Sequence, residues 1–420
     1  MTKIKKILRK IMLILTLIII LGGIAFGILI HFDKIEQEKQ YQIKIKEENK
    51  LESQRMEQKR KENKWKAQQM EQERKENIID DKTREELRKK FDSKEDRKKI
   101  EEITKKIKKE KRNAELYYKR GELYSYVYEN KKAYSDYTKA IELNPNKGLY
   151  YVGRAIIYKD NEIKKAEEDI AKALELSDDL ETYKATGVYY AIKDEYESAI
   201  EMYKKALLMK LSDKETMDLY ERLEDVYNLN FNATELLELS EINIERFPKN
   251  FKGYYYKAEA YQMVYDAVSS GDIEKGYANR EIINAYTEGI KKASKKSRLY
   301  LGRGNWYYSF GEYSIAEKDY IEAIKLAEDS SDKIMAYYNI AVLYDEIGKK
   351  DEAVKYYKKT IDEDINRSEN CEKSDSIESC KALIKIYDMN KDTENMKKYE
   401  LLLKELEKYH RILNEDSRGN

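Results

Sequence analysis

The side chains of this 420-residue chain offer little material for covalent chemistry. His31 and His410 are its only histidines, and Cys371 and Cys380 are its only cysteines. A catalytic triad or a zinc site needs several such groups close together. The GRGN motif at 302–305 is neither preceded by a strand nor followed by the GKS or GKT of a phosphate loop. We therefore expect no catalytic residue, cofactor or metal site, and we predict that the protein is not an enzyme.

The two cysteines leave two alternatives. Cys371 and Cys380 are near enough in sequence to form one local bridge. A long helical chain does not need such a staple, which favours two unpaired thiols in a surface insertion. The sequence does not decide between them.

Composition favours an all-α fold and argues against nucleic acid as a partner. The chain carries 82 basic and 81 acidic residues, a net charge of +1, so no basic excess points to nucleic acid. It has two prolines and 38 tyrosines. Few helix breakers, together with abundant Glu, Lys, Leu and Ala, are typical of helices. Tyrosine suits helices with one buried edge, because its ring packs while its hydroxyl stays solvated.

The N-terminus predicts a membrane anchor. Residues 11–30 carry no charge and are almost wholly apolar, and about 20 such residues span a bilayer as a helix. The tail at 1–10 is basic and without acids, so we expect it to stay in the cytoplasm. We therefore predict a single-pass protein of a bacterial envelope. Residues 11–30 would contact the lipid bilayer, and the C-terminal domain would be extracytoplasmic. A cleaved signal peptide is the alternative.

Residues 33–112 predict a charged helical stalk or a weak coiled coil. Glu–Lys pairs four residues apart, such as Glu57–Lys61, support an isolated helix. Apolar residues are too sparse for a strict heptad. Self-association through the stalk is therefore possible, and a partly disordered linker is the alternative. We expect a helix break near 79–81 and N-terminal caps at Thr83 with Glu86 and at Ser93 with Asp96. The apolar stripe of Ile100, Ile103 and Ile107 is expected to cap the next domain.

A repeat of about 34 residues begins at Ala114. Its first copy places Tyr, Gly, Tyr, Ala, Tyr, Ala and Pro at 117, 121, 124, 133, 137, 140 and 145. This pattern resembles the tetratricopeptide repeat family. The best copies are 114–147, 148–179, 180–213, 297–330 and 334–367, within a predicted solenoid at 113–410 of about eight helical hairpins, followed by a disordered tail at 411–420. Other copies are degenerate: Glu224 stands where a small residue belongs, and extra loops occupy 269–275 and 369–379.

The resemblance implies a concave groove lined by the first helix of each hairpin. In family members that bind a C-terminal carboxylate, the positions of Asn305 and Asn339 hold the peptide. The basic residues of that clamp are not matched here, since Leu301 stands where a lysine is expected. We therefore do not expect carboxylate clamping. The candidate groove residues are Tyr118, Glu122, Val152, Ile156, Val188, Tyr255, Glu259, Leu301, Asn305, Tyr308, Tyr338, Asn339 and Val342.

These features together predict a membrane-anchored scaffold of the cell envelope. Its groove would bind a peptide or a partner helix from an unidentified protein. The alternative is a structural spacer, or a self-associating stalk protein without a dedicated peptide ligand.

Overall fold

The computed structural model describes Met12, Lys59, Ile79 and residues 81–158, 162–268, 273–367 and 373–417. The chain divides into two compact units, Met1–Ile78 and Ile79–Asn420. Every regular element among the described residues of the second unit is helical, so the predicted all-α fold is confirmed. The predicted tail at 1–10, the anchor at 11–30 except Met12, and the stalk to residue 78 except Lys59 lie outside the described residues. Within the described part of the chain, no helix has the length and apolar character needed to cross a membrane.

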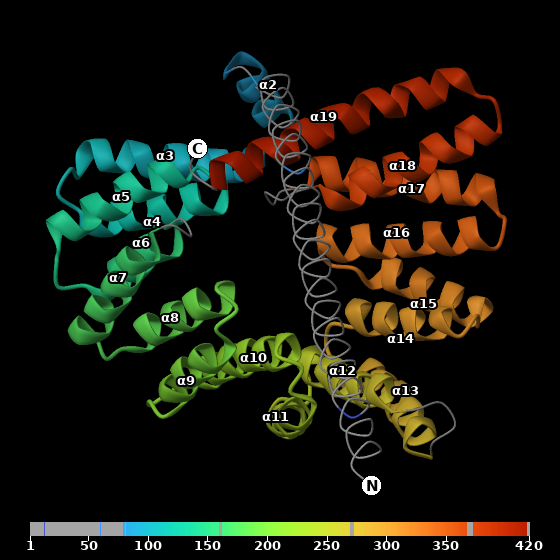
Figure 1. Cartoon of the computed structure of the whole chain (residues 1–420), viewed down its shortest axis with the longest axis horizontal. Coiled ribbons are helices and arrows are strands. Elements are labelled where there is room, and N and C mark those ends of the chain that lie inside the picture. Colours follow the sequence, from blue (N-terminus) through green and yellow to red (C-terminus); the bar gives the residue numbers. More distant parts are fainter. Residues whose placement is uncertain are drawn as a thin grey trace, which may run out of the picture. The chain divides into compact units, whose positions relative to one another are not determined.

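Sixteen helices of the second unit form eight consecutive hairpins, as predicted (Figure 1). The hairpins are α4 (Ala114–Tyr126) with α5 (Asn130–Leu143), α6 (Gly148–Ile156) with α7 (Ile163–Leu176), α8 (Leu180–Ile192) with α9 (Tyr196–Leu207), α10 (Asp213–Leu229) with α11 (Ala233–Arg246), α12 (Phe251–Ala267) with α13 (Ile273–Lys292), α14 (Ser297–Ser309) with α15 (Tyr313–Leu326), α16 (Ser330–Glu346) with α17 (Lys350–Asn366), and α18 (Ser374–Met389) with α19 (Thr393–Ser417). Each hairpin packs against the next, which gives an α-solenoid.

The two helices of a hairpin approach each other closely where a glycine of the first helix faces a tyrosine of the second. A Cβ placed on Gly304 would lie 2.8 Å from Cε1 of Tyr320, sixteen residues later on the second helix. Gly121 faces Tyr137 in the same way. The glycines of the sequence repeat are therefore packing residues, and GRGN at 302–305 is a contact between helices.

An arginine–aspartate pair also recurs inside the hairpins. Arg303 donates from Nε and Nη2 to the two carboxylate oxygens of Asp319, each at 2.8 Å. Arg120 and Asp136 form the same two-pronged bond at 2.7 Å. Such bidentate pairs fix the orientation of both side chains. The spacing is sixteen residues in these two pairs and fifteen in the pair of Arg154 with Asp169, a sequence signal that the prediction did not use.

The region predicted as a stalk to residue 112 instead ends in two helices that belong to the second unit. These are α2 (Asp81–Phe91) and α3 (Lys94–Lys109). The predicted cap at Ser93 is confirmed, because the Ser93 side chain accepts a hydrogen bond from the Asp96 backbone N–H. The predicted cap at Thr83 is wrong, because α2 already begins at Asp81 and Thr83 lies in its first turn. Ile100 and Ile107 are buried, so α3 covers α4 as the predicted cap of the solenoid.

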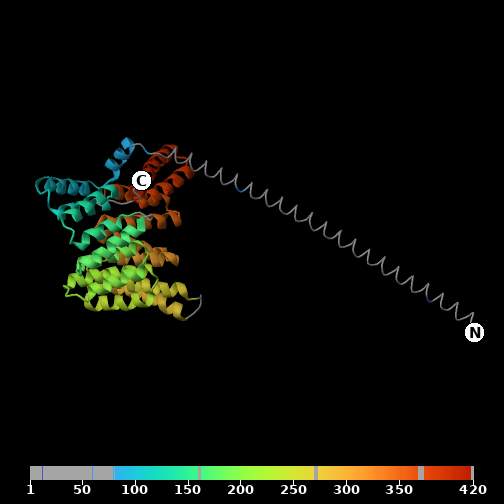
Figure 2. The same ribbon diagram turned by 60° about the vertical axis from the view of Figure 1, so that its left-hand side comes forward.

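The last helix contacts the first helices of the unit. Figures 1 and 2 both show α2 beside α19. The rings of Phe91 and Tyr409 lie 5.3 Å apart, and Ile412 and Leu413 are fully buried. The disordered tail predicted from 411 is therefore wrong as far as Ser417, where α19 ends. The apolar residues of this C-terminal segment are covered by helices more than 300 residues away in sequence.

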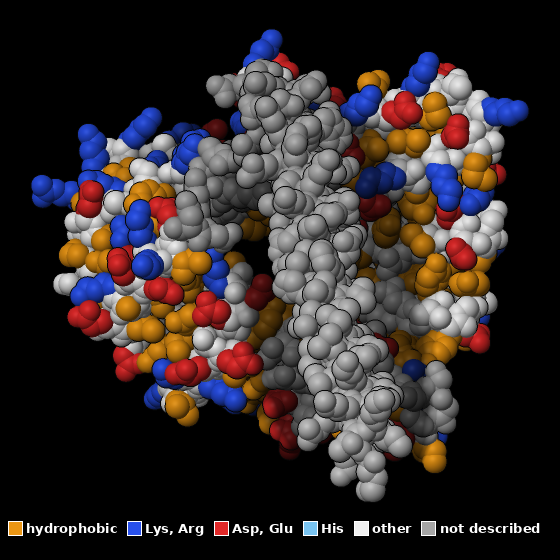
Figure 3. All heavy atoms as spheres, in the orientation of Figure 1, with side chains coloured by type: hydrophobic (Ala, Val, Ile, Leu, Met, Phe, Trp, Pro, Cys, Tyr) orange, Lys and Arg blue, Asp and Glu red, His pale blue; other side chains and the backbone are white. Residues whose placement is uncertain are grey.

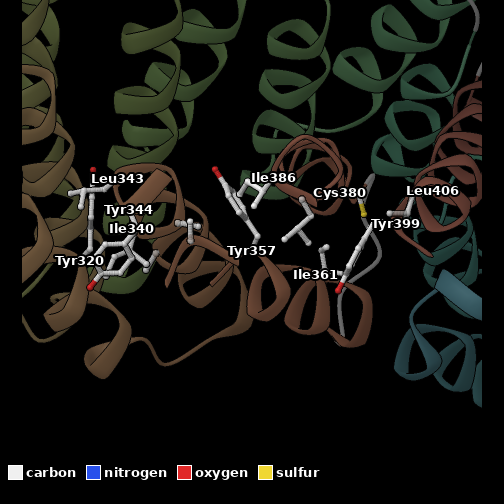
Figure 4. Packing of buried hydrophobic residues seen from close by; sticks show 14 of the residues in the cluster. Tyr320, Ile340, Leu343, Tyr344, Tyr357, Ile361, Cys380, Ile386, Tyr399 and Leu406 are labelled. Carbon is white, nitrogen blue, oxygen red and sulfur yellow. The ribbon is translucent and has the colours of Figure 1, made fainter. Parts of the chain in front are cut away.

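The largest hydrophobic cluster runs through the last three hairpins. Tyr320, Tyr357 and Cys380 belong to it, and Figure 4 shows these side chains between the helices. Cys380 is a free thiol with no exposed surface, and burial raises its pKa to about 12. The expected surface position of this cysteine is therefore wrong. Cys371 lies outside the described residues.

Candidate functional site

All thirteen predicted groove residues lie on the first helices of hairpins. They are distributed over α4, α6, α8, α12, α14 and α16. Three of them need correction, because Tyr118, Val152 and Leu301 are buried at 7%, 0% and 5% exposure. The ring of Tyr118 stacks on Tyr150 at 5.1 Å, inside the core between two hairpins. These three side chains therefore support the first helices from within.

The remaining predicted residues keep some exposed surface. Glu122 and Asn305 are exposed, and the others are partly exposed: Ile156, Val188, Tyr255, Glu259, Tyr308, Tyr338, Asn339 and Val342. Tyr308 and Tyr338 each lie beside another tyrosine of the solenoid, Tyr313 at 5.6 Å and Tyr357 at 6.2 Å between ring centroids. Their role in binding stays a prediction.

A cavity of about 490 Å³ brings three predicted residues together. Tyr255 and Glu259 reach it from α12, and Asn305 reaches it from α14. The other lining residues were missed from the sequence: Gln262, Tyr265, Asp266, Tyr286, Gly302, Trp306, Ser309 and Phe310. One signal was available, since Gln262 and Asp266 follow Glu259 at helical spacings of three and seven.

Three aromatic side chains form one wall of this cavity. Trp306 packs edge-on against Tyr265 at 5.0 Å and against Phe310 at 5.1 Å between ring centroids. The indole Nε1–H of Trp306 donates to Oδ1 of Asn279 at 2.8 Å, which holds the ring in place. Phe310 is 48% exposed, so the wall is open to solvent at this point. We call Tyr265, Trp306 and Phe310 the aromatic wall.

The aromatic wall already contacts a cation of the chain. Nζ of Lys275, from the start of α13, lies 4.2 Å from the centroid of the Tyr265 ring. The same ammonium donates to the carbonyl oxygen of Val268 at 3.2 Å. A cation over an aromatic face is attracted by the negative potential of the ring. The cavity edge is thus suited to ammonium or guanidinium groups.

Acidic groups face the same cavity. Burial raises the pKa of Glu259, although hydrogen bonds from Tyr255 and Tyr286 oppose this shift. The Tyr286 hydroxyl donates to Oε1 of Glu259 at 3.2 Å. Asp266 is exposed at the cavity edge. An approaching cation would favour the ionised form of Glu259 and lower its pKa.

Two asparagine amides link the cavity to the next hairpin. Nδ2 of Asn339 donates to Oδ1 of Asn305 at 2.8 Å, and the Tyr320 hydroxyl donates to the same oxygen at 2.9 Å. Nδ2 of Asn305 and Oδ1 of Asn339 have no hydrogen-bond partner among the described residues. One donor group and one acceptor therefore remain available on neighbouring first helices, α14 and α16.

The described residues contain no cluster of His, Cys, Asp and Glu able to hold a metal ion.

The degenerate position Glu224 is fully buried and belongs to the core. Nδ2 of Asn243 donates to both of its carboxylate oxygens, at 2.9 and 3.0 Å.

Comparison with known proteins identifies the repeats. The tetratricopeptide repeat pattern matches residues 114–147 and 296–362, so the chain carries tetratricopeptide repeats. Photosystem I assembly protein Ycf3 of Cyanophora paradoxa is 34% identical over 73 residues, which are 17% of this chain and 42% of that protein. Its counterpart in Synechococcus sp. (strain CC9605) is 32% identical over 78 residues, 19% of this chain and 45% of that protein. The chain thus spans less than half the length of these curated relatives.

Two solved structures resemble the chain at low sequence identity. A thermophilic tetratricopeptide repeat protein of Thermus thermophilus is 22% identical, with a TM-score of 0.36, and the match covers 44% of this chain and 91% of that one. The human IFIT1 dimer with m7Gppp-AAAA is 14% identical, with a TM-score of 0.45, and the match covers 75% of this chain and 76% of that one. Nothing about the function of this chain follows from these likenesses.

Proposed function

We propose that the protein is an interaction scaffold that binds an extended peptide of a partner protein across α12, α14 and α16. The Asn305–Asn339 pair carries this proposal. An extended backbone presents N–H and C=O groups in alternation. The free donor of Asn305 can bond a peptide carbonyl, while the free acceptor of Asn339 can bond a peptide N–H. These groups lie on a rigid first-helix surface, so little conformational entropy opposes binding.

The neighbouring cavity supplies side-chain specificity in this proposal. Its aromatic wall stands beside Glu259 and Asp266. Aromatic faces combined with carboxylates favour lysine or arginine over neutral or acidic side chains. The proposed ligand is therefore an extended peptide whose basic residue enters the cavity while its backbone bonds the asparagine pair.

A peptide-display selection on the full-length chain in mild detergent tests this function. We expect enriched sequences to contain Lys or Arg, and Asn305→Ala to weaken binding of the selected peptides by about tenfold, the cost of about one hydrogen-bonding anchor. Asn284→Ala is the matched control, because Asn284 is exposed on the second helix α13 and outside the cavity. Selected peptides that bind Asn305→Ala as tightly as the parent would contradict the proposal.

We further propose that residues 11–30 anchor the scaffold with its solenoid outside the cytoplasm. This proposal is supported by the sequence, in which the uncharged segment follows a basic tail. Protease treatment of intact spheroplasts tests the topology. We expect the protease to digest the solenoid. Complete protection of the solenoid in these spheroplasts would rule out the proposed orientation.

A further inference from the structure

A second cavity, separate from the peptide groove, lies where α2, α3 and the start of α5 meet. Its volume is about 910 Å³, within the range of small-molecule sites. Eight basic residues line it against four acidic ones: Arg84, Arg88, Lys89, Lys94, Arg97, Lys98, Lys131 and Lys132, against Glu85, Asp92, Glu101 and Glu129. Lys and Arg side chains gather on the side of Figure 3 where α3 and α5 lie. The cavity therefore carries a positive potential.

Arg97 is held in the cavity by two carboxylates. Its Nε donates to Oδ2 of Asp92 at 3.0 Å, its Nη2 bonds the same oxygen, and its Nη1 donates to Oε1 of Glu129. These bonds use three of the five guanidinium N–H groups, so two remain for a ligand. The carboxylates also fix the plane of the guanidinium before any ligand arrives. Preorganised arginines of this kind suit the planar, two-pronged recognition of oxyanions.

Three rim lysines complete the positive lining. Lys89 on α2 and Lys94 and Lys98 on α3 are exposed, and none of them has a hydrogen bond or an ion pair with another described residue. Two of the four acids, Asp92 and Glu129, are already bonded by arginine. Arg84, Arg88 and Lys132 are likewise paired with acids, so the three rim lysines stand against Glu85 and Glu101 and leave a small cationic excess around the cavity.

We propose that this cavity binds an anion bearing two or more phosphate groups. A single phosphate would leave most of the volume empty, whereas a larger phosphorylated anion can contact Arg97 and the separated rim lysines together. Phosphate offers more charge and more acceptor oxygens per group than a carboxylate does. The groups could come from a lipid headgroup or from a soluble polyphosphate, which share this chemistry.

Titration calorimetry with the full-length chain in mild detergent, near physiological salt, tests the site with sodium tripolyphosphate. We expect saturable single-site binding that the triple variant Lys89→Gln/Lys94→Gln/Lys98→Gln weakens by at least about tenfold. The control variant Lys105→Gln/Lys108→Gln/Lys109→Gln removes the same charge from α3 at exposed positions outside the cavity. Its affinity should change by less than about threefold, since distant exposed charges are screened.

Three comparisons interpret the result. Equal losses in the two triple variants, or the absence of saturable binding, would overturn the site. Citrate should bind at least about tenfold more weakly than tripolyphosphate, and equal affinity would overturn the preference for phosphate. Tighter binding of dioctanoyl phosphatidylinositol 4,5-bisphosphate, a lipid with several phosphate groups, than of tripolyphosphate would assign the site to a lipid headgroup. The reverse order would assign it to a soluble phosphorylated ligand.

Discussion

The hydroxyl of Tyr409 donates a 2.7 Å hydrogen bond to Oδ1 of Asp92, joining residues 317 positions apart. Asp92 is buried and also accepts from Arg88 and Arg97. One carboxylate thus connects the last helix of the solenoid, the α2–α3 corner and the basic cavity. The ends of the described solenoid are held together by this contact.

Removing the Tyr409 hydroxyl should therefore loosen α2. The variant Tyr409→Phe leaves a buried acceptor without one of its donors, at a cost of about 1–3 kcal/mol. Hydrogen exchange should accelerate in α2 and in the end of α19 before it does so in the central hairpins. Tyr196→Phe is the control, because the Tyr196 hydroxyl bonds Asp194 at an exposed site. Unchanged exchange in α2 would show that the contact does not hold the two ends.

Gly304→Ala should destabilise the protein although alanine favours helices. The new Cβ would lie 2.8 Å from the Tyr320 ring, and overpacking of this kind costs about 1–3 kcal/mol. Gly276→Ala should instead stabilise the protein by about 0.5–1 kcal/mol, since nothing lies within 4 Å of its added Cβ. Urea unfolding measures both. The prediction fails if the two variants shift the free energy of unfolding in the same direction.

Phe231→Gly should stabilise the turn between α10 and α11. Phe231 has a φ of 55° and is 81% exposed, so its ring contributes little packing while its backbone lies in the left-handed region. Relief of that conformation is worth roughly 1 kcal/mol. Leu208 is 89% exposed at the end of α9 but has a φ of −77°, and Leu208→Gly should give no such gain. Thermal unfolding compares the two variants, and equal shifts would contradict the backbone explanation.

Glu224 should make stability depend on pH. Burial raises its folded pKa to about 8 from an ordinary value of 4.5. Between these values the folded protein holds a proton that the unfolded chain has lost, so stability falls as the pH rises, by up to about 1.4 kcal/mol per pH unit. Below pH 4.5 and above pH 8 the contribution of Glu224 to the free energy of unfolding does not change with pH.

Glu224→Gln should remove that slope, because an amide does not titrate. Urea unfolding from about pH 5 to about pH 8 measures it, with Glu238→Gln as an exposed control on the same hairpin. A slope that persists in Glu224→Gln would place its origin at another group.

The groove shows where prediction from the sequence ends. The spacing of Tyr, Gly and Ala placed all thirteen candidate residues on first helices, since the repeat specifies the register of each hairpin. Yet Tyr118, Val152 and Leu301 are buried, while Trp306 and Phe310 form the cavity wall. Each residue of a helix is rotated by about 100° from the one before it, so neighbouring residues of one helix can lie on a buried and on an exposed face. Which face is covered therefore depends on how the next hairpin stacks.

Local spacing, then, was enough to establish the all-α class, the hairpin repeat and the cap at Ser93, because these depend on residues within about one repeat of one another. Only the tertiary structure showed that α2 and residues 411–417 pack into the solenoid, because composition assigned them to a stalk and a tail. A few apolar residues among many charged ones, such as Phe91 and Leu413, become a core only when both ends of the unit meet. The basic cavity forms where α2 lies beside α3 and the start of α5. Contacts between segments so distant in the chain leave no local pattern in the sequence.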